Sequence, residues 1–251
     1  MFALKNEFAP WRAMWAFRAA RWGPANVHVA RFGGAEVGVL LTGVGRRQAA
    51  RKIAEINFES CGSIECVISS GLAGGLRPEY TIGEVLAAKY VLSDGADSPP
   101  VSSSAHLMNL ALECGATAVD SFFSADHVIS SADEKRGIGA LANAVEMESF
   151  EVLRGAAGMG IPAIAVRAVS DSLEEDLPVD MNRIFTADGE VSIPRVLGEV
   201  GRRPAAIPGL VRLGRRSRAA AESLAFFLNS YVPKLTDLAR PVETEVAFSH
   251  G

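Results

Sequence analysis

The sequence is poor in the residues that mark several common classes of protein. Cysteine occurs three times, at Cys61, Cys66 and Cys114, and without a CxxC spacing. This is typical of reduced, buried thiols rather than of a disulfide framework or a nucleophile. The four histidines form no HExxH motif and no cluster with the spacing of metal ligands, so we expect no metal site.

Long apolar runs and an excess of one charge are also missing. No run reaches the roughly 18 apolar residues that a membrane-spanning helix needs. Charged side chains interrupt the N-terminal region, unlike the apolar stretch of a signal peptide. Acidic and basic residues nearly balance, with a formal net charge of −4, so the whole chain has no general attraction for nucleic acid or anionic lipid. We therefore expect a cytoplasmic protein.

The sequence does have the material for a sizeable core. Hydrophobic residues make up 49% of the 251 residues, which suits one α/β domain or two small ones. No internal repeat or low-complexity segment divides the chain. We predict a single domain over residues 1–251.

Short apolar runs alternate with helical patterns along the chain. Strands are expected at 26–32, 36–42, 66–70, 82–91 and 161–169, the first two around a Gly33-Gly34 turn; helices are expected at 46–56, 102–115, 147–160 and 205–231. The strand runs are apolar throughout rather than alternating, which indicates a sheet covered on both faces. The predicted fold is α/β, a three-layer α/β/α sandwich with a central twisted mixed β-sheet.

Polar and glycine-rich clusters follow several of these strands: Thr42-Gly43, Ser70-Gly71, Glu146 to Glu148, and Ser170-Asp171. Ligands of open α/β sheets bind beyond the carboxyl ends of the strands. Each cluster also has a structural interpretation, as first-turn acids favoured by the helix dipole, as caps, or as tight turns. The convergence of several clusters favours a ligand site.

Three segments carry a resemblance to a known family: "FALKNEF" (2–8), "VISSGLAGGL" (67–76) and "AVEMESFEVLRGAAGMGIPAIAVRAVSD" (144–171). They resemble the nucleoside phosphorylase and nucleosidase superfamily, and the likeness covers most of the chain. It implies a phosphorylase/hydrolase-like fold and cleavage of the N-glycosidic bond of a purine nucleoside. The tail from "DGEVSIP" onwards is most similar to the hopanoid-associated branch, whose activity is attributed to removing adenine from adenosylhopane.

The resemblance implies roles for individual residues. Glu148 would bind the ribose 2′- and 3′-hydroxyls, with Met147 against the sugar. Asp171 would face N7 of the purine as general acid, and Glu7 would position the attacking water. The other residues implied in substrate binding are Glu146, Leu72, Ala73, Gly74, Val128, Ile129, Arg167 and Ser170.

The choice between hydrolysis and phosphorolysis depends on an anion site. Where hexameric bacterial phosphorylases have an arginine and a Ser/Thr, the matching positions here are Ser69 and Leu72. Gly43, Gly45 and Arg46 are a possible substitute, because a helix start favours anions. We expect water to be the nucleophile and no cofactor to be needed. A phosphate-dependent purine nucleoside phosphorylase is the alternative, with phosphate as its second substrate.

Two features depart from the family pattern. The fold normally opens with a strand before the "ALKNE" segment, but only Met1 and Phe2 precede it here, so either most of that strand is lacking or the true start lies upstream. Phe8, Trp11, Trp15 and Trp22 fall at helical spacing on an expected first helix. They are interpreted as core or subunit interface, with an apolar wall for a bulky substrate as the alternative.

The segment 195–218 is strongly basic, within an expected basic helical segment over 195–231. It carries seven arginines against one glutamate. A solvated face is the ordinary meaning of such a run, and contact with an anionic membrane surface is the alternative. Nucleic-acid binding is not expected, because no aromatic residue lies among these arginines. The expected partners are a small nucleoside and further copies of the chain, a homodimer first. The competing interpretation is a non-catalytic nucleoside-binding or membrane-surface module.

Overall fold

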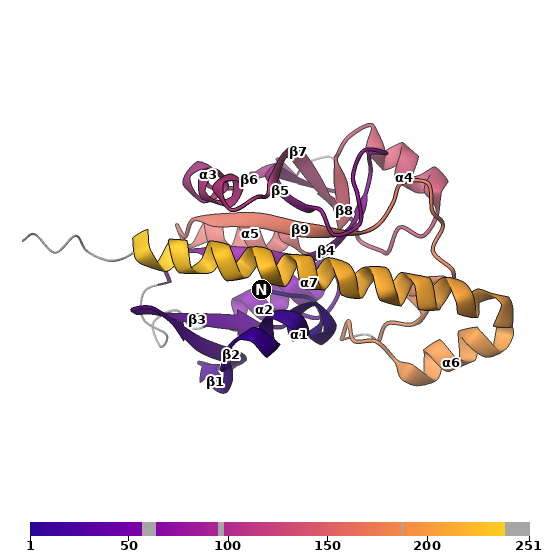
Figure 1. Cartoon of the computed structure of the whole chain (residues 1–251), viewed down its shortest axis with the longest axis horizontal. Helices are drawn as coiled ribbons and strands as arrows, with labels where there is room; N and C mark the ends of the chain where they lie inside the picture. Colours follow the sequence, from indigo (N-terminus) through magenta and orange to yellow (C-terminus); the bar gives the residue numbers. More distant parts are fainter. Residues whose placement is uncertain (57–63, 95–97, 187, 239–251) are drawn as a thin grey trace, which may run out of the picture.

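The computed structural model describes residues 1–56, 64–94, 98–186 and 188–238. Its elements are α1 (Lys5–Met14), β1 (Arg18–Trp22), β2 (Ala25–Phe32), β3 (Ala35–Leu40), α2 (Arg46–Ala54), β4 (Val67–Gly75), β5 (Val85–Ser93), β6 (Val101–Ser102), α3 (Ala105–Glu113), β7 (Thr117–Ser124), α4 (Ala132–Gly139), β8 (Ala144–Glu146), α5 (Ser149–Gly158), β9 (Ala163–Asp171), the 3-10 turns η2 (Met181–Arg183) and η3 (Pro204–Ala206), α6 (Ile193–Arg202) and α7 (Ile207–Leu238). Helices flank a mixed sheet on both sides (Figure 1).

The expected α/β fold with a central mixed sheet is confirmed. The larger sheet has the order β6-β5-β7-β8-β4-β9, and β5 also pairs with β9, so the sheet curls round and closes on itself. The pairs β4–β9, β5–β7 and β7–β8 are parallel, whereas β4–β8, β5–β9 and β5–β6 are antiparallel. The strands β1, β2 and β3 form a separate antiparallel meander.

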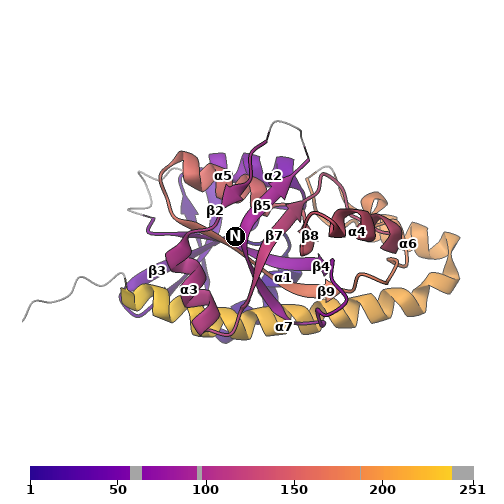
Figure 2. The same cartoon turned by 90° about the horizontal axis from the view of Figure 1, so that it is seen from above.

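Strand β9 explains why the apolar runs do not alternate. Ile164, Val166 and Ala168 lie in a core cluster with residues of α1, α3 and α7. Ala163, Ala165 and Val169 lie in a second cluster with residues of α2 and α5. Figure 2 shows these two sets of helices on opposite sides of the sheet. Both faces of β9 are therefore buried, as the sequence predicts.

The first helix is shorter than its aromatic spacing predicts. It ends at Met14, and Trp22 lies at the end of β1, so the prediction of one helical face with all three tryptophans is wrong. Trp11 is buried within a cluster that includes Phe2, Phe8, Phe17 and Phe32. Trp15 packs against Phe32 and donates its indole N–H to Asn229. The spacing misleads because the chain after Met14 is extended and pairs with β2.

The first residues join the two sheets. Phe2 forms a parallel bridge with Leu41 of the chain after β3, and the Ser70 N–H of β4 donates to the Met1 carbonyl. The Met1 amino group donates to the Ile68 carbonyl at 2.6 Å. Burial lowers its pKa to about 5. Met1 and Phe2 thus lie between the end of β3 on one side and β4 on the other.

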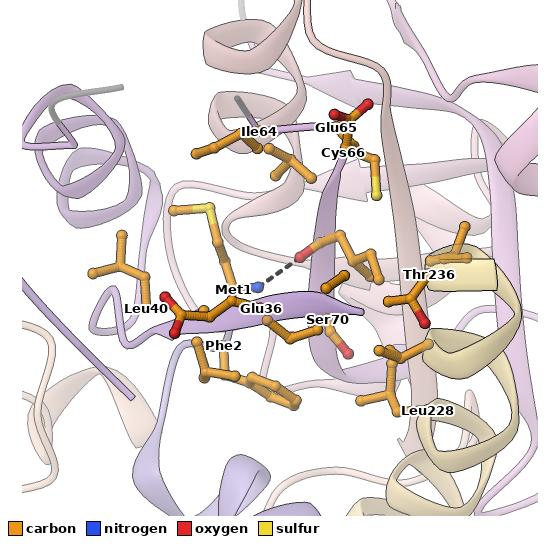
Figure 3. A pocket seen from close by; sticks show the side chains of 18 of the residues that line it. Met1, Phe2, Glu36, Leu40, Ile64, Glu65, Cys66, Ser70, Leu228 and Thr236 are labelled. Atoms are coloured by element: carbon orange, nitrogen blue, oxygen red, sulfur yellow. Dashed lines mark hydrogen bonds between the residues drawn. The ribbon is translucent and has the colours of Figure 1, made fainter. Parts of the chain in front are cut away.

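A cavity of about 460 Å³ lies next to Met1 and Phe2, between β3 and the first half of β4 (Figure 3). Its walls are mainly apolar and include Trp11, Trp22 and α7 residues such as Leu228. None of the acids expected in the site lines it. Trp11 and Trp22 therefore line a space away from those acids, and Trp11 has the buried core position that the sequence favours.

The basic segment is helical, as expected. It forms α6, η3 and the first half of α7, which extend beyond the sheet in both views (Figures 1 and 2). Among the residues that the structure describes, no helix is both long enough and apolar enough to cross a membrane. Of the three cysteines, Cys61 lies outside the described residues, and Cys66 and Cys114 are partly buried, unpaired thiols. Burial raises the pKa of both thiols, that of Cys66 to about 11, which disfavours the thiolate.

Candidate active site

Two of the acids predicted from the sequence, Glu7 and Asp171, lie against the glycine-rich half of β4. Gly74 pairs with Asp171 of β9 on one side and with Val145 of β8 on the other. A Cβ atom at Gly74 would lie 3.0 Å from Asp171 Oδ2, and one at Gly71 would lie 3.1 Å from Glu7 Oε1. Both glycines therefore let a carboxylate approach the backbone of this strand closely. The strand expected at 66–70 continues to Gly75, so the glycine-rich segment after Ser70 is in fact the last half of β4.

Glu7 is held over β4 by the first turn of α1. Its Oε2 accepts the N–H groups of Ala3 at 3.1 Å and Leu4 at 3.0 Å, and its Oε1 accepts the N–H of Leu72 at 3.1 Å. The side chain is thus both a cap of α1 and a group at the site. Burial raises the pKa of Glu7, against the effect of these hydrogen bonds and of Arg167. A raised pKa brings a carboxylate closer to the range in which it can exchange protons near neutral pH.

Glu146 and Arg167 form a fully buried ion pair beneath the site. Arg167 Nη2 lies 2.5 Å from Glu146 Oε2, which also accepts the N–H groups of Glu148 and Ser149. The Ser124 hydroxyl donates to Oε1 of the same carboxylate. Burial alone would raise the pKa of Glu146, but the guanidinium and the hydrogen bonds hold it below its usual value. Glu146 and Arg167 were both expected to bind substrate. Their internal partners suit them to orienting the backbone of residues 147–149.

Glu148 differs from Glu146 although it is only two residues away. Its Oε1 accepts the Gly45 N–H at 2.8 Å, and its Oε2 is 3.5 Å from Arg167 Nη2. Burial, followed by the negative charge of Glu146, raises the pKa of Glu148 to about 8, although Arg167 acts in the opposite direction. Met147 lines a cavity of about 320 Å³ together with Gly45 and the turn around Asn182. The two acids of "VEME" thus share Arg167 but have opposite pKa shifts, because Glu146 lies closer to the guanidinium and accepts more hydrogen bonds.

Asp171 ends β9 with a partner on each oxygen. The Ser170 hydroxyl donates to Oδ1 at 2.7 Å. Lys135 Nζ of α4 donates to Oδ2 at 2.5 Å, from a side chain that has no exposed surface. The Ser170 hydroxyl also lies 3.2 Å from the Ala73 carbonyl, which ties Asp171 to the end of β4. Lys135 is a site residue that the sequence reasoning missed.

The segment expected to read the base carries a second unforeseen contact. The Val128 N–H donates to Asn182 Oδ1 at 2.7 Å, and the Asn182 amide donates back to the Val128 carbonyl at 3.0 Å. Ile129 is buried in a small cluster with Leu76 and Val145, so its side chain supports the segment from below. The Val128 backbone thus presents one donor and one acceptor side by side, both taken by an amide.

The residues of the possible anion site at the start of α2 have internal partners. The N–H of Gly43 donates to the Ala3 carbonyl, and that of Gly45 donates to Glu148. Arg46 is paired with Glu151 at 3.1 Å. Anion binding here stays a prediction, and an anion would compete with these internal contacts. Within the described ranges, no three side chains of His, Cys, Asp or Glu come together in an arrangement that could hold a metal ion.

The geometry therefore places Glu7 and Asp171 along the glycine-rich half of β4. Glu148 lies beside Arg167 of the neighbouring strand β9, and Met147 lines the cavity next to Gly45. Lys135 and Asn182 were missed because their partners lie 36 and 54 positions away along the chain. A fully buried lysine carries no local pattern. The serine cap and first-turn acids of α4 could have predicted the helix, though not the direction of the lysine.

Solved structures share this fold. Futalosine hydrolase of Helicobacter pylori matches with a TM-score of 0.71 at 18% identity, over 93% of this chain and 95% of that chain. The 5′-methylthioadenosine/S-adenosylhomocysteine nucleosidase of Campylobacter jejuni matches at 0.69 and 18%, over 93% and 96%. The corresponding nucleosidase of Neisseria meningitidis, in complex with methylthio-immucillin-A, matches at 0.68 and 20%, over 93% and 96%.

No curated protein matches the chain. The family described as the phosphorylase superfamily matches residues 10–193. That range includes Met147, Glu148 and Asp171, and it ends where α6 begins. Because the match spans well over half of the sequence, the protein belongs to the phosphorylase superfamily.

Proposed function

We propose that the protein is a nucleosidase that hydrolyses the N-glycosidic bond of an adenine nucleoside. The observation that carries the proposal is the placing of Glu7 and Asp171 against the glycine-rich half of β4, with Glu148 beside Arg167 on the adjoining strand β9. These three acids come from α1, the start of α5 and β9, which lie far apart in the sequence. They do suit a reaction that leaves positive charge on a sugar and negative charge on a base.

The ribose half of the site consists of Glu148 and Met147. A carboxylate can accept both O–H groups of a vicinal diol, and a methionine offers a soft apolar wall to the sugar ring. Burial of Glu148 excludes water from these contacts. Glu7 lies on the same strand end with a raised pKa, which supports its role as the base that orients and deprotonates a water molecule.

The base half consists of Asp171 and the Val128 backbone. Asp171 is the group that would transfer a proton to N7 as the bond to the sugar breaks, a type of catalysis worth roughly 10²–10⁴-fold. The Val128 N–H and carbonyl favour a base edge that has an acceptor next to a donor. The Asn182 amide, with its oxygen and its N–H group, already binds them in this way. Adenine has such an edge in N1 and its amino group, whereas the corresponding edge of hypoxanthine has the reverse order. This supports adenine as the base.

Water is favoured over phosphate as the nucleophile by the state of the cations and hydroxyls nearby. Arg46 is paired with Glu151, and Arg167 is paired with Glu146. The Ser69 hydroxyl is hydrogen-bonded to Ser149 at 2.9 Å, and Leu72 offers no hydroxyl. To bind these arginines, a phosphate dianion would have to displace the carboxylates that pair with them. The displaced carboxylates would then be buried charges without a partner.

The resemblance of the C-terminal segment extends the proposal to a 5′ substituent that is hydrophobic, as in adenosylhopane. The support in the structure is the exposed apolar and basic surface of α6 and the start of α7. Ile193 and Leu197 are 64% and 65% exposed, one helical turn apart. Asn182, Phe185 and Thr186 line the cavity beside Met147, and α6 begins only a few residues later. A lipid-linked nucleoside at a membrane surface would reach the site along this side.

The test is a substrate panel with and without inorganic phosphate. It includes adenosine, inosine, methylthioadenosine, S-adenosylhomocysteine and a 5′-alkyl adenosine. Chromatography measures the free base that is released. We expect release of adenine, no dependence on phosphate, and the highest kcat/KM for the alkyl compound. Formation of ribose 1-phosphate would establish the phosphorylase alternative. Binding without turnover of any compound would favour the non-catalytic module and overturn the proposal.

A further inference from the structure

Lys135 is among the most completely enclosed charged side chains in the described part of the chain. It has no exposed surface, and its Nζ donates to three oxygens: Asp171 Oδ2 at 2.5 Å, the Ser172 carbonyl at 2.8 Å and the Glu175 carbonyl at 3.1 Å. An ammonium group has three N–H donors, so each one has an acceptor. The charge is therefore fixed in position at the end of β9.

The other charged groups around Lys135 are engaged elsewhere. On α4 and the chain after β9, each acid has another partner: Asp133 and Glu174 pair with Arg136, Glu134 pairs with His127, Glu175 pairs with Arg216, and Asp176 accepts the Ala132 N–H. The Arg77 guanidinium, near the end of α4, donates to the Leu76 and Gly139 carbonyls. Asp171 is thus the carboxylate that faces the ammonium directly. Removing a charged lysine from water is costly unless such a partner stabilises it.

This pairing conflicts with the simplest version of the proposed reaction. An ammonium group 2.5 Å from Oδ2, together with the Ser170 hydroxyl on Oδ1, stabilises Asp171 as a carboxylate. A carboxylate has no proton to give to a departing base. The nearest proton that can be transferred through Asp171 is on Lys135 Nζ.

We propose that Lys135 supplies the proton that Asp171 delivers to the base, an inference that rests on the proposed nucleosidase function. As the bond between the sugar and the base breaks, its electron pair moves into the base, and N7 takes a proton from an Asp171 oxygen. Asp171 takes a proton from Lys135 Nζ, which becomes neutral. Water adds to the sugar carbon and loses its proton to Glu7. Exchange with solvent returns that proton from Glu7 and reprotonates Lys135, so atoms and charges balance.

A purely structural role for Lys135 would be to hold α4 against the chain after β9. The two roles differ in what an arginine can replace. Arginine keeps a positive charge and hydrogen bonds beside Asp171, but it does not give up its proton in proteins. The two roles also predict different effects of the leaving group. A leaving group that departs as a stable anion needs no proton, so its release should not depend on a proton from Lys135.

The experiment compares Lys135→Arg and Lys135→Met with the wild type, with Arg136→Met as the matched control on the same helix. The substrates are the adenine nucleoside identified in the panel and p-nitrophenyl β-D-ribofuranoside. We expect Lys135→Arg to lower kcat for the nucleoside by roughly 10²–10⁴-fold, the range of general-acid catalysis, with KM changed less than about threefold. Hydrolysis of the p-nitrophenyl riboside stays within about twofold of wild type, and Arg136→Met behaves as wild type on both substrates.

Circular dichroism and thermal unfolding of each variant are the second measurement, because they separate a loss of activity from a loss of folding. If Lys135→Met does not fold, as judged by circular dichroism and thermal unfolding, the leaving-group comparison in Lys135→Arg remains decisive.

Two outcomes would overturn the inference while leaving the nucleosidase intact. One is full kcat for the nucleoside in Lys135→Arg, which would make the charge alone sufficient. The other is an equal loss on both substrates, which would indicate misplaced residues rather than a missing proton. A wild-type protein that releases no base from any nucleoside would instead refute the proposed function itself.

Discussion

Glu146 and Glu148 show how two acids separated by one residue acquire different properties. Glu146 faces a guanidinium, two backbone N–H groups and a hydroxyl, and its pKa is lowered. Glu148 is buried with fewer donors and beside the charge of Glu146, and its pKa is raised. Pairs of acids driven apart in this way are typical of catalytic sites. At this scale, surroundings rather than residue type assign the roles.

The raised pKa of Glu148 predicts a pH-dependent effect on stability. A carboxyl group whose pKa is higher in the folded protein contributes stability that is complete below its ordinary value of 4.5 and is lost as the pH rises through about 8. Glu148→Gln cannot ionise, so it avoids that loss. We expect the unfolding midpoint of the variant, relative to wild type, to rise by several degrees between about pH 5.5 and about pH 8.5.

Differential scanning calorimetry at the two pH values measures this effect. Glu113→Gln is the control, since Glu113 is an exposed glutamate at the end of α3. It should show the same difference from wild type at both values. A Glu148→Gln variant whose difference from wild type does not change with pH would contradict the assignment of the raised pKa.

At the scale of elements, the site depends on where strands end and on one short turn. β4 and β9 run parallel, so their ends bring Gly74 and Asp171 to the same edge, and β8 brings Val145 there from the opposite direction. The turn η2 then places the Asn182 amide on the Val128 backbone. A base that uses this backbone must displace the amide, because an N–H donates to one acceptor well at a time.

Replacing Asn182 by alanine should therefore strengthen substrate binding. A typical hydrogen bond contributes about 0.5–1.5 kcal/mol net, so loss of the competing amide should lower KM for the adenine nucleoside by roughly 2–10-fold. Steady-state kinetics provides the measurement, and kcat should change little. Met181→Ala is the control in the same turn. A higher KM in Asn182→Ala would mean that the amide helps to hold the substrate, which contradicts displacement.

At the scale of the molecule, α6 and the start of α7 form a basic arm beyond the sheet (Figures 1 and 2). Its exposed apolar residues are Ile193, Leu197, Ile207 and Val211, with exposed fractions of 64%, 65%, 45% and 48%. Several of its arginines have local partners, such as Arg202 with Glu199 at 2.8 Å and Arg216 with Glu175. The apolar face with flanking arginines suits an anionic lipid surface more than water.

Flotation with liposomes tests the arm. We expect the protein to float with vesicles that contain anionic phospholipid and to remain in solution with neutral ones, since arginines attract the anionic surface. Replacing Ile193 and Leu197 together by serine should abolish flotation. Phe226→Ser is the matched control, because Phe226 is 65% exposed on α7 away from the arm. Absence of binding to either kind of vesicle would remove the membrane contact from the proposal.

Much of the local structure could be predicted because it depends on neighbours in sequence. Apolar runs and glycines predicted β2, β4 and β9, and the serine before α3 and the glycine after it predicted that helix. The same locality explains the errors. Aromatic spacing from Phe8 to Trp22 fits a helix, but the partner of the later residues is β2. The acceptors of the Gly43 and Gly45 N–H groups, Ala3 and Glu148, are likewise distant in the sequence and could not be predicted from it.

The sequence by itself determined the α/β class and a sheet covered on both faces, because periodicity is a property of nearby residues. Its motifs predicted the acids Glu7, Glu148 and Asp171 through a resemblance. Only the tertiary structure decided that the sheet closes through β5 and β9, and that Lys135 meets Asp171. It also decided which of the two acids in "VEME" is paired internally. These outcomes depend on distances and burial between segments far apart in the chain, and such interactions leave no local pattern.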